Sequence, residues 1–341
     1  MHEPAETLPA TAYSDRSRWP RERAAVFARA WLCVGHACEV PEVGDAVPFE
    51  TAGWPLLLVR QTDGSVQVLA NVCRHRAAPL VWDADRPRGL RHLQCRYHGW
   101  RYGLDGVRVA SPSFGRTLPD GLDLVQVPTA TWRGLVFAWP GPGKPRPFDA
   151  WIGPLDAVAS GVDLEDFVFH KRVQHELACD WKVYVENYLE GYHIPWLHPG
   201  LSSEIELARY EVHPGERHVV HRVPTRGAGP NAGFWAWLWP SLALNVYGDG
   251  VSVERIVPLG GGRTRIDYAY LFRAHAAVDR DATLAMSREV TQEDVTICEA
   301  VQRGLDSGLV RQGVLSPRHE SGVRAFQDLV RAAMDEESAD C

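Results

Sequence analysis

The sequence has 341 residues and a formal net charge of −7, with 45% hydrophobic and 23% charged residues. This length allows two domains with separate cores, and the acidic balance excludes the extended basic surface of a nucleic-acid-binding protein. No stretch reaches the roughly eighteen apolar residues of a membrane span. The N-terminal segment carries Glu3, Glu6, Asp15 and Arg16 in place of an apolar leader. We therefore expect a cytoplasmic protein with neither a membrane nor a nucleic-acid partner.

The N-terminal half predicts a helical arm followed by a small all-β domain. Residues 20–32 show helical periodicity. Short apolar segments then alternate with Gly, Asp and Pro turns, which is the rhythm of strands in an all-β domain. These segments are 56–59, 66–69, 124–127 and 135–139. The Pro- and Gly-rich run 139–147 is compatible with neither a helix nor a central strand and marks a domain boundary.

The second half mixes helices with strands. Helical periodicity covers 179–193, 281–307 and 321–334, and strand patterns cover 171–178, 210–223, 234–247, 251–257 and 264–273. We expect an α+β protein whose second domain is an antiparallel sheet covered by helices, in a helix-grip-like arrangement. The expected parts are an arm over 1–44 packed on the second domain, an all-β domain over 45–140, and the second domain over 141–341.

Two Cys-plus-His pairs are the strongest chemical signal. Cys73 and His75 form a Cys-x-His loop, and Cys95 and His98 form a Cys-x-x-His loop. A Rieske [2Fe-2S] centre binds one iron through two thiolates and the other through two neutral imidazoles, and these loops supply that set. A structural zinc ion accepts the same donors. We expect the other cysteines to be reduced and mostly buried: Cys33, Cys38, Cys179, Cys298 and Cys341.

The two loops resemble the cluster motif of Rieske non-haem iron oxygenases, specifically their oxygenase (alpha) component. The resemblance rests on Arg76 after the first pair and on Tyr97, Gly99 and Trp100 around the second. It continues through residues 186–198 and 293–305, so it spans most of residues 50–310. The spacer between the pairs is longer than is common, and residues 83–89 read as a polar turn insertion.

A Rieske cluster passes single electrons, so we expect a second redox centre in the C-terminal domain. The expected centre is a mononuclear Fe(II) held by two His and one carboxylate, with open positions for O₂ and substrate. His193 and His198 are the predicted imidazole ligands. An unbroken helix would separate them by about 140°, but Pro195 breaks the turn and lets both approach one ion.

The carboxylate ligand is expected in the helix over 281–307, which offers Glu293, Asp294 and Glu299. Asp294 begins a stripe that we expect to face the core, namely Asp294, Ile297, Cys298, Val301 and Leu305. Glu293 and Glu299 are rotated from Asp294 by about 100° and 140°, where we expect a solvated helix face. Asp294 is therefore the predicted third ligand, because a buried carboxylate needs a partner and a metal supplies one.

The resemblance implies a head-to-tail homotrimer in which an acidic residue, three positions before the first ligand His, links that His to a cluster His of the next subunit. Carried over, Glu190 connects His193 to His98 of the partner subunit, and Asn187 lies near the iron. Most of the family has Asp where this chain has Glu190. Glutamate resembles the branch of choline and carnitine monooxygenases, although Asp180 stands where that branch often has Asn.

The resemblance also implies the reaction. Electrons come from NAD(P)H through a separate flavin or iron–sulfur reductase, and this chain has no Gly-rich phosphate loop of its own. The Fe(II) site then uses O₂ to hydroxylate a C–H bond of a small molecule, which becomes an oxidative demethylation where the carbon is an N- or O-methyl group.

The substrate is indicated only by an aromatic run. Trp235, Trp237 and Trp239 alternate along one expected strand and, with Tyr247, could wall a pocket. Such a wall suits a quaternary ammonium ion through cation–π attraction, and it equally suits a planar aromatic ring. Each Trp is also compatible with the core of the sheet. Two other functions stay open: an aromatic ring-hydroxylating dioxygenase, which usually works with a small β subunit, and a Rieske electron carrier without oxygenase activity.

Overall fold

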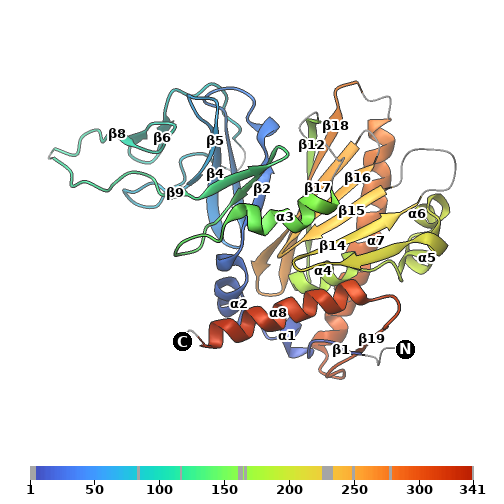
Figure 1. The fold of residues 1–341 in the computed structure, drawn as a ribbon. Helices are drawn as coiled ribbons and strands as arrows, with labels where there is room; N and C mark the ends of the chain where they lie inside the picture. Colours follow the sequence, from blue (N-terminus) through green and yellow to red (C-terminus); the bar gives the residue numbers. More distant parts are fainter. Residues whose placement is uncertain are drawn as a thin grey trace. The chain divides into compact units, whose positions relative to one another are not determined.

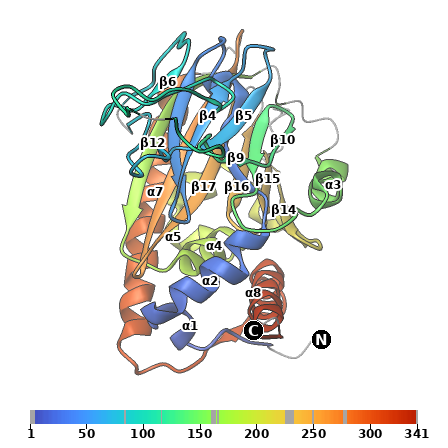
Figure 2. The ribbon, with the colours of Figure 1, turned by 90° about the vertical axis from the view of Figure 1, so that its left-hand side faces the viewer.

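The structure is a computed structural model. It describes residues 5–82, 85–115, 117–159, 164, 167–224, 233–247, 250–275 and 279–339. The chain forms two compact units (Figures 1 and 2): a smaller unit of residues 31–145, and a larger unit in which the first 30 residues join residues 146–341. No helix in the described ranges is long and apolar enough to cross a membrane.

The smaller unit consists of short antiparallel strands in three sheets. One sheet has the order β3 (Ala46–Thr51), β4 (Trp54–Arg60), β5 (Val66–Ala70) and β9 (Gln126–Val127). A second has the order β10 (Thr129–Trp132), β11 (Leu135–Ala138) and β2 (Leu32–His36). The third has β6 (Leu93–Gln94), β7 (Arg101–Tyr102) and β8 (Arg108–Ala110). The prediction of an all-β domain is confirmed.

One core cluster of the smaller unit lies beneath the two Cys-plus-His loops. It joins Leu57 of β4 and Leu69 of β5 to Cys73, Cys95 and Trp100. All five side chains are at most 2% exposed. The sulfur atoms are therefore anchored in the hydrophobic core rather than on mobile surface loops.

The larger unit is built on a seven-stranded antiparallel sheet. Its order is β12 (Phe167–Leu177), β18 (Arg263–Arg273), β17 (Gly250–Gly260), β16 (Leu242–Tyr247), β15 (Gly233–Leu238), β14 (His218–Val223) and β13 (Glu211–Pro214). The predicted strands exist, but two of them are hairpins. The stretch 210–223 turns at Gly215, and 234–247 turns at Pro240, because each of these residues favours a turn over a continuous strand.

Three main helices pack with this sheet: α4 (Trp181–Tyr188), α7 (Arg280–Asp306) and α8 (Ser321–Ala339). Side chains cap the first two, since Asp180 accepts from the Lys182 amide and Asp279 accepts from the Ala282 amide. Figure 1 shows α7 running along the strands and α8 crossing near their lower ends. The prediction of an α+β fold with an antiparallel sheet and helices is confirmed.

The N-terminal elements differ from the sequence prediction. The expected helix over 20–32 is shorter: α2 spans Trp19–Ala25, and a 3₁₀ turn follows over Phe27–Arg29. Leu32 instead begins β2, all five residues of which are buried. The smaller unit therefore starts at residue 31 and not at 45, because β2 pairs with β11 within it. It ends at 145, and a helix that the sequence did not predict, α3 (Phe148–Val158), follows.

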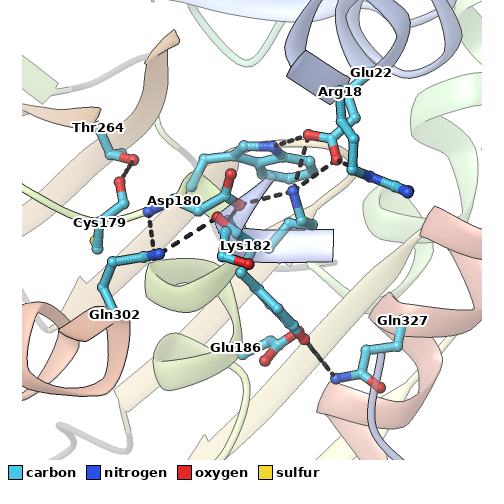
Figure 3. A network of polar contacts seen from close by, with 12 residues as sticks. Arg18, Glu22, Cys179, Asp180, Lys182, Glu186, Thr264, Gln302 and Gln327 are labelled. Carbon is cyan, nitrogen blue, oxygen red and sulfur yellow. Dashed lines mark hydrogen bonds and ion pairs between the residues drawn. The ribbon is translucent and has the colours of Figure 1, made fainter. Parts of the chain in front are cut away.

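The N-terminal arm is joined to α4 by a buried charge network (Figure 3). The Lys182 Nζ donates to both oxygens of Glu22 on α2, at 2.9 and 2.8 Å, and lies 2.7 Å from Oδ1 of Asp180. The Trp181 indole also donates to Glu22, at 3.2 Å. The Lys182 side chain is fully buried. A buried cation with two carboxylate partners is costly to disrupt, so this network holds the arm against α4.

A second contact in the same region involves a carboxyl group that accepts hydrogen bonds from neutral side chains. Glu186 accepts hydrogen bonds from the Tyr13 hydroxyl of α1 (Thr11–Ser14), at 2.6 Å, and from the Gln327 amide of α8, at 3.0 Å. Burial raises the pKa of Glu186 to about 7, although both hydrogen bonds act in the opposite direction. The neutral and ionised forms of Glu186 are therefore similarly populated near pH 7 in the folded protein.

We predict that Glu186→Gln changes the pH dependence of stability. The folded-state pKa of Glu186 is raised from 4.5 to about 7, so its contribution is fully present below pH 4.5 and is lost as the pH rises through 7. Glutamine accepts the same bonds and cannot ionise. At pH 8 the variant should exceed wild type in free energy of unfolding by about 1–3 kcal/mol, and at pH 4.5 the two should agree.

The measurement is denaturant unfolding at both pH values, with Asp328→Asn on the exposed side of α8 as the control. A difference between Glu186→Gln and wild type that is the same at both pH values would contradict this interpretation.

Candidate active site

The two Cys-plus-His loops have the same backbone construction. In the first, the Cys73 amide donates to the Ala78 carbonyl and the Ala77 amide donates to the Cys73 carbonyl. In the second, the Cys95 amide donates to the Trp100 carbonyl and the Gly99 amide donates to the Cys95 carbonyl. Both turns contain a left-handed residue, Ala77 with φ 56° and Gly99 with φ 73°. Each loop is thus closed on itself and presents its Cys and His together.

The four predicted donors converge. The Cys73 and Cys95 side chains interact with each other, and the His75 and His98 ring centroids are 4.6 Å apart. His75 is held by stacking on Trp100, with a centroid distance of 4.9 Å and an interplanar angle of 5°. Tyr102 places its hydroxyl 3.3 Å from the Cys73 sulfur. The structure therefore places the two cysteines next to each other and the two histidines next to each other.

These donors suit a cluster with imidazole ligands. The Nδ1 atom of His75 is buried and has no hydrogen-bond partner within the described part of the chain. Desolvation, together with the charges of His75 and Arg76, lowers the pKa of His98, which favours the neutral imidazole that a metal requires. A bound iron would satisfy the orphaned nitrogen.

A second convergence lies in the larger unit. Ligand atoms of His193, His198 and Asp294 all lie within 4.8 Å of one another. The two histidines flank α5 (Ile194–Leu197), a separate short helix that carries Pro195. The Nε2 atoms of His198 and His193 are 3.1 and 3.9 Å from Oδ1 of Asp294. This is the donor set of a two-His-one-carboxylate metal site.

Two further carboxylates orient the imidazoles. The Nδ1 of His193 is 2.5 Å from Oε1 of Glu190, and the Nδ1 of His198 is 2.6 Å from Oε2 of Glu293. An imidazole whose Nδ1 donates to its carboxylate can offer Nε2, the atom that faces Asp294, to a metal ion. Burial alone would lower the pKa of His198, but Asp294 and Glu293 outweigh it and raise that pKa when no metal is bound. Glu190 also accepts from the backbone amides of residues 192 and 193.

Asn187 supports the third donor. Its amide donates to Oδ1 of Asp294 at 2.7 Å, and it lies on α4, one turn before Glu190. The sequence placed Asn187 near the expected iron, and the structure gives it a contact with the candidate carboxylate rather than a place among the three donors.

The predicted face of α7 is partly wrong. Its buried residues are Thr291, Asp294, Cys298 and Gln302, whereas Ile297 and Val301 are 38% and 45% exposed. The buried stripe of α7 therefore includes polar side chains in place of Ile297 and Val301. Asp294 belongs to this stripe and is 9% exposed. Glu293 and Glu299 are not merely solvated, as the sequence suggested. Glu293 binds His198, and Glu299 accepts from the Ala178 amide at 2.9 Å.

A cavity of about 580 Å³ opens beside the three donors. Trp235 and Tyr247 line it, as expected from the aromatic run. Trp237 and Trp239 do not line it, because both pack against Phe326 of α8, with ring centroids 5.5 and 6.1 Å apart. The sequence missed Glu254, Tyr184 and Tyr268, which also line the cavity, because they lie within otherwise apolar segments.

We predict that Glu293 strengthens metal binding through His198. Glu293→Gln removes the charge that fixes the His198 imidazole, so the dissociation constant for Fe(II) should rise by roughly 10- to 100-fold. Anaerobic Fe(II) titration measures this, with Glu289→Gln on the exposed face of the same helix as the control. Equal affinities of the two variants would contradict the orienting role.

Two family models match the chain: the Rieske [2Fe-2S] domain over residues 30–129, and the ring-hydroxylating alpha subunit (catalytic domain) over residues 164–336. The chain is 27% identical over 347 residues to the chloroplastic choline monooxygenase of Beta vulgaris, covering 95% of this chain and 76% of that protein. It is 29% identical over 356 residues to the carnitine monooxygenase oxygenase subunit of Escherichia coli K12, covering 96% and 93%.

The fold is similar to that of the quaternary ammonium Rieske monooxygenase CntA in complex with an inhibitor, with a TM-score of 0.89, 24% identity and coverage of 97% and 96%. The catalytic-domain model alone matches more than half of the chain. This chain is therefore a member of the ring-hydroxylating alpha-subunit family, a Rieske non-haem iron oxygenase that uses a [2Fe-2S] cluster, a mononuclear iron and O₂.

Proposed function

We propose that this chain is the oxygenase component of a monooxygenase that hydroxylates a small cationic amine. In this proposal Cys73, His75, Cys95 and His98 hold the [2Fe-2S] cluster, while residues 193, 198 and 294 hold Fe(II). When bound, the cluster supplies single electrons and the iron supplies O₂ activation for insertion of oxygen into a C–H bond. The alternative of an electron carrier without oxygenase activity is wrong, because the catalytic-domain model matches residues 164–336.

The charge of the cavity is the observation that carries the proposal. Five carboxyl side chains line it, namely Glu190, Glu204, Glu254, Asp279 and Asp294. No Lys or Arg is among the lining residues that the structure describes. One Fe(II) and two neutral imidazoles do not balance this many carboxylates. A cleft lined by one sign of charge attracts ligands of the opposite sign, so the cavity favours a cation.

The aromatic lining supports the same class of substrate. Tyr184, Tyr188, Tyr247, Tyr268 and Trp235 all line the cavity. Aromatic faces attract alkylammonium groups through the ring quadrupole, and this attraction is strongest where water is excluded. Choline and carnitine, named in the two relatives, each carry a trimethylammonium group. A planar aromatic hydrocarbon would gain the same apolar contacts but nothing from the carboxylates.

Glu190 is the proposed path for electrons to the iron ligand His193. Its side chain is 11% exposed and is fixed by the His193 imidazole and two backbone amides. His98, on the smaller unit, is exposed and so accessible to another copy of the chain. We propose a homotrimer in which Glu190 bridges His193 to His98 of the partner subunit. A separate flavin or iron–sulfur reductase is proposed to reduce the cluster.

The substrate class is tested by O₂ consumption. With an artificial reductase system, the holoenzyme should consume O₂ faster when choline or another alkylammonium compound is added, because the cation enters the acidic cavity beside Fe(II). Benzoate and naphthalene should have no effect. If only the aromatic compounds stimulated O₂ consumption, the protein would instead be an aromatic ring-hydroxylating dioxygenase.

The bridging role of Glu190 is tested in a single turnover. Glu190→Gln can still accept a bond from His193, so both metal centres and the oligomer should persist. Electron transfer from a reduced cluster to the iron site should slow by at least tenfold, about 1.4 kcal/mol in the barrier. Stopped-flow absorbance of the cluster follows this step. Transfer at the wild-type rate would remove Glu190 from the path.

A further inference from the structure

Glu254 differs in its partners from most of the buried carboxylates of this chain. It lies in the middle of β17, is 1% exposed and lines the cavity. Five other buried acidic side chains each have a cation or a histidine of the candidate metal site beside them: Glu22 has Lys182, Glu39 has Arg86, Asp45 has Arg88, Asp267 has Arg255 and Asp294 has His198. Glu254 forms no ion pair with any residue that the structure describes. Glu186 is also held by neutral donors, but it is not among the residues that line the cavity.

The hydrogen bonds of Glu254 all come from neutral groups. Its Oε1 accepts from the Tyr184 hydroxyl at 2.6 Å, and its Oε2 lies 3.4 Å from the Asn245 amide nitrogen. Tyr268, its partner across the strand pair, also donates to it. These donors stabilise a carboxylate without neutralising it. A buried carboxylate in such a place is costly unless a positive charge arrives, so the cavity has an uncompensated anionic point.

This anionic point belongs to the same wall as the metal donors. The Tyr184 and Tyr268 hydroxyls are 3.1 Å apart, and Thr291 of α7 donates to Tyr268 at 3.2 Å. Thr291 precedes Asp294 by one helical turn on the buried face of α7. A ligand whose charge rests against Glu254 therefore lies in the same cavity that His193, His198 and Asp294 line.

The state of Glu254 without a ligand agrees with this reading. Burial raises its pKa to about 7, with hydrogen bonds from Tyr184 and Tyr268 acting against the shift and the charge of Asp294 adding to it. The carboxyl group is thus close to balance between its neutral and charged forms at neutral pH. A cation that enters the cavity completes the ionisation.

We propose that Glu254 is the counter-anion for the ammonium group of the substrate, and that the substrate is an alkylammonium ion without a carboxylate. This inference rests on the proposed function and makes it more specific. A zwitterion such as carnitine has a carboxylate, and among the lining residues placed in the structure no Lys or Arg is available to receive it. An amino alcohol such as choline avoids this cost.

The experiment measures binding to the Fe-loaded holoenzyme by calorimetry. The three probes are choline, L-carnitine and 3,3-dimethyl-1-butanol, the neutral carbon analogue of choline. Wild type should bind choline most tightly. Glu254→Gln should weaken choline binding by roughly 10- to 100-fold, the range for loss of a charged partner, while binding of the neutral alcohol stays the same. Glu211→Gln, an exposed acid on β13 of the same sheet, is the matched control and should match wild type.

The outcomes separate this inference from the proposed function. A wild type that binds the neutral alcohol as tightly as choline overturns the cationic substrate and hence the proposed function. A wild type that prefers choline, with a Glu254→Gln variant that keeps this preference, overturns only the role of Glu254. Iron content and the Rieske spectrum show whether the variant is folded. If the variant is not folded, the comparison of choline and carnitine in the wild type tests the proposal. Carnitine binding as tight as choline binding would overturn it.

Discussion

The orientation of two imidazoles by two carboxylates is the constraint on which the catalytic unit depends. Glu190 and Glu293 each occupy an Nδ1 atom, and both Nε2 atoms then face Asp294. The carboxylates come from different elements: Glu190 follows α4, and Glu293 is on α7. The sheet and the arm matter because they hold these two helices in place. The buried Lys182 network fixes the start of α4, and Asn187 ties α4 to Asp294.

The buried carboxylates of the larger unit differ in their partners and therefore in their roles. Where a carboxylate has an Arg or Lys partner, as Asp267 and Glu22 do, it holds elements together. Where a carboxylate faces His193 or His198 of the candidate metal site, it orients the imidazole. Glu186 and Glu254 fit neither class, because both have neutral donors. Of the two, only Glu254 lines the cavity, where a cation from outside the chain can reach it. The same principle, that a buried charge needs a partner, explains all three.

Local motifs in the sequence were enough to select candidate metal donors that the structure brings together. The Cys-His loops and the two histidines around Pro195 are short segments whose chemistry does not depend on distant residues, and the structure brings both sets together. Helical phase was enough to select Asp294 but not to describe its neighbours. The buried face of α7 includes Thr291 and Gln302. The predicted face extended from Asp294 through apolar residues, so it was rotated from the buried face in the structure. Glu293 was consequently missed as a partner of His198.

Contacts between distant segments could not be predicted. The Glu22–Lys182 pair spans 160 positions, and nothing near either residue indicates the other. The aromatic run gave no means to separate Trp235, at the cavity, from Trp237, against α8. The place of Glu254 in the cavity could not be predicted for the same reason, since residues of α4, β16 and β18 together form its environment.

The most direct test of this account is the Fe(II)–nitric oxide signal in electron paramagnetic resonance. Reduced wild type treated with nitric oxide should show both the mononuclear iron adduct and the Rieske signal. Asp294→Ala should lose the adduct and keep the Rieske signal, because the three donors of one site are independent of the two Cys-plus-His loops. An Asp294→Ala variant that retains the full adduct would contradict the proposed iron site.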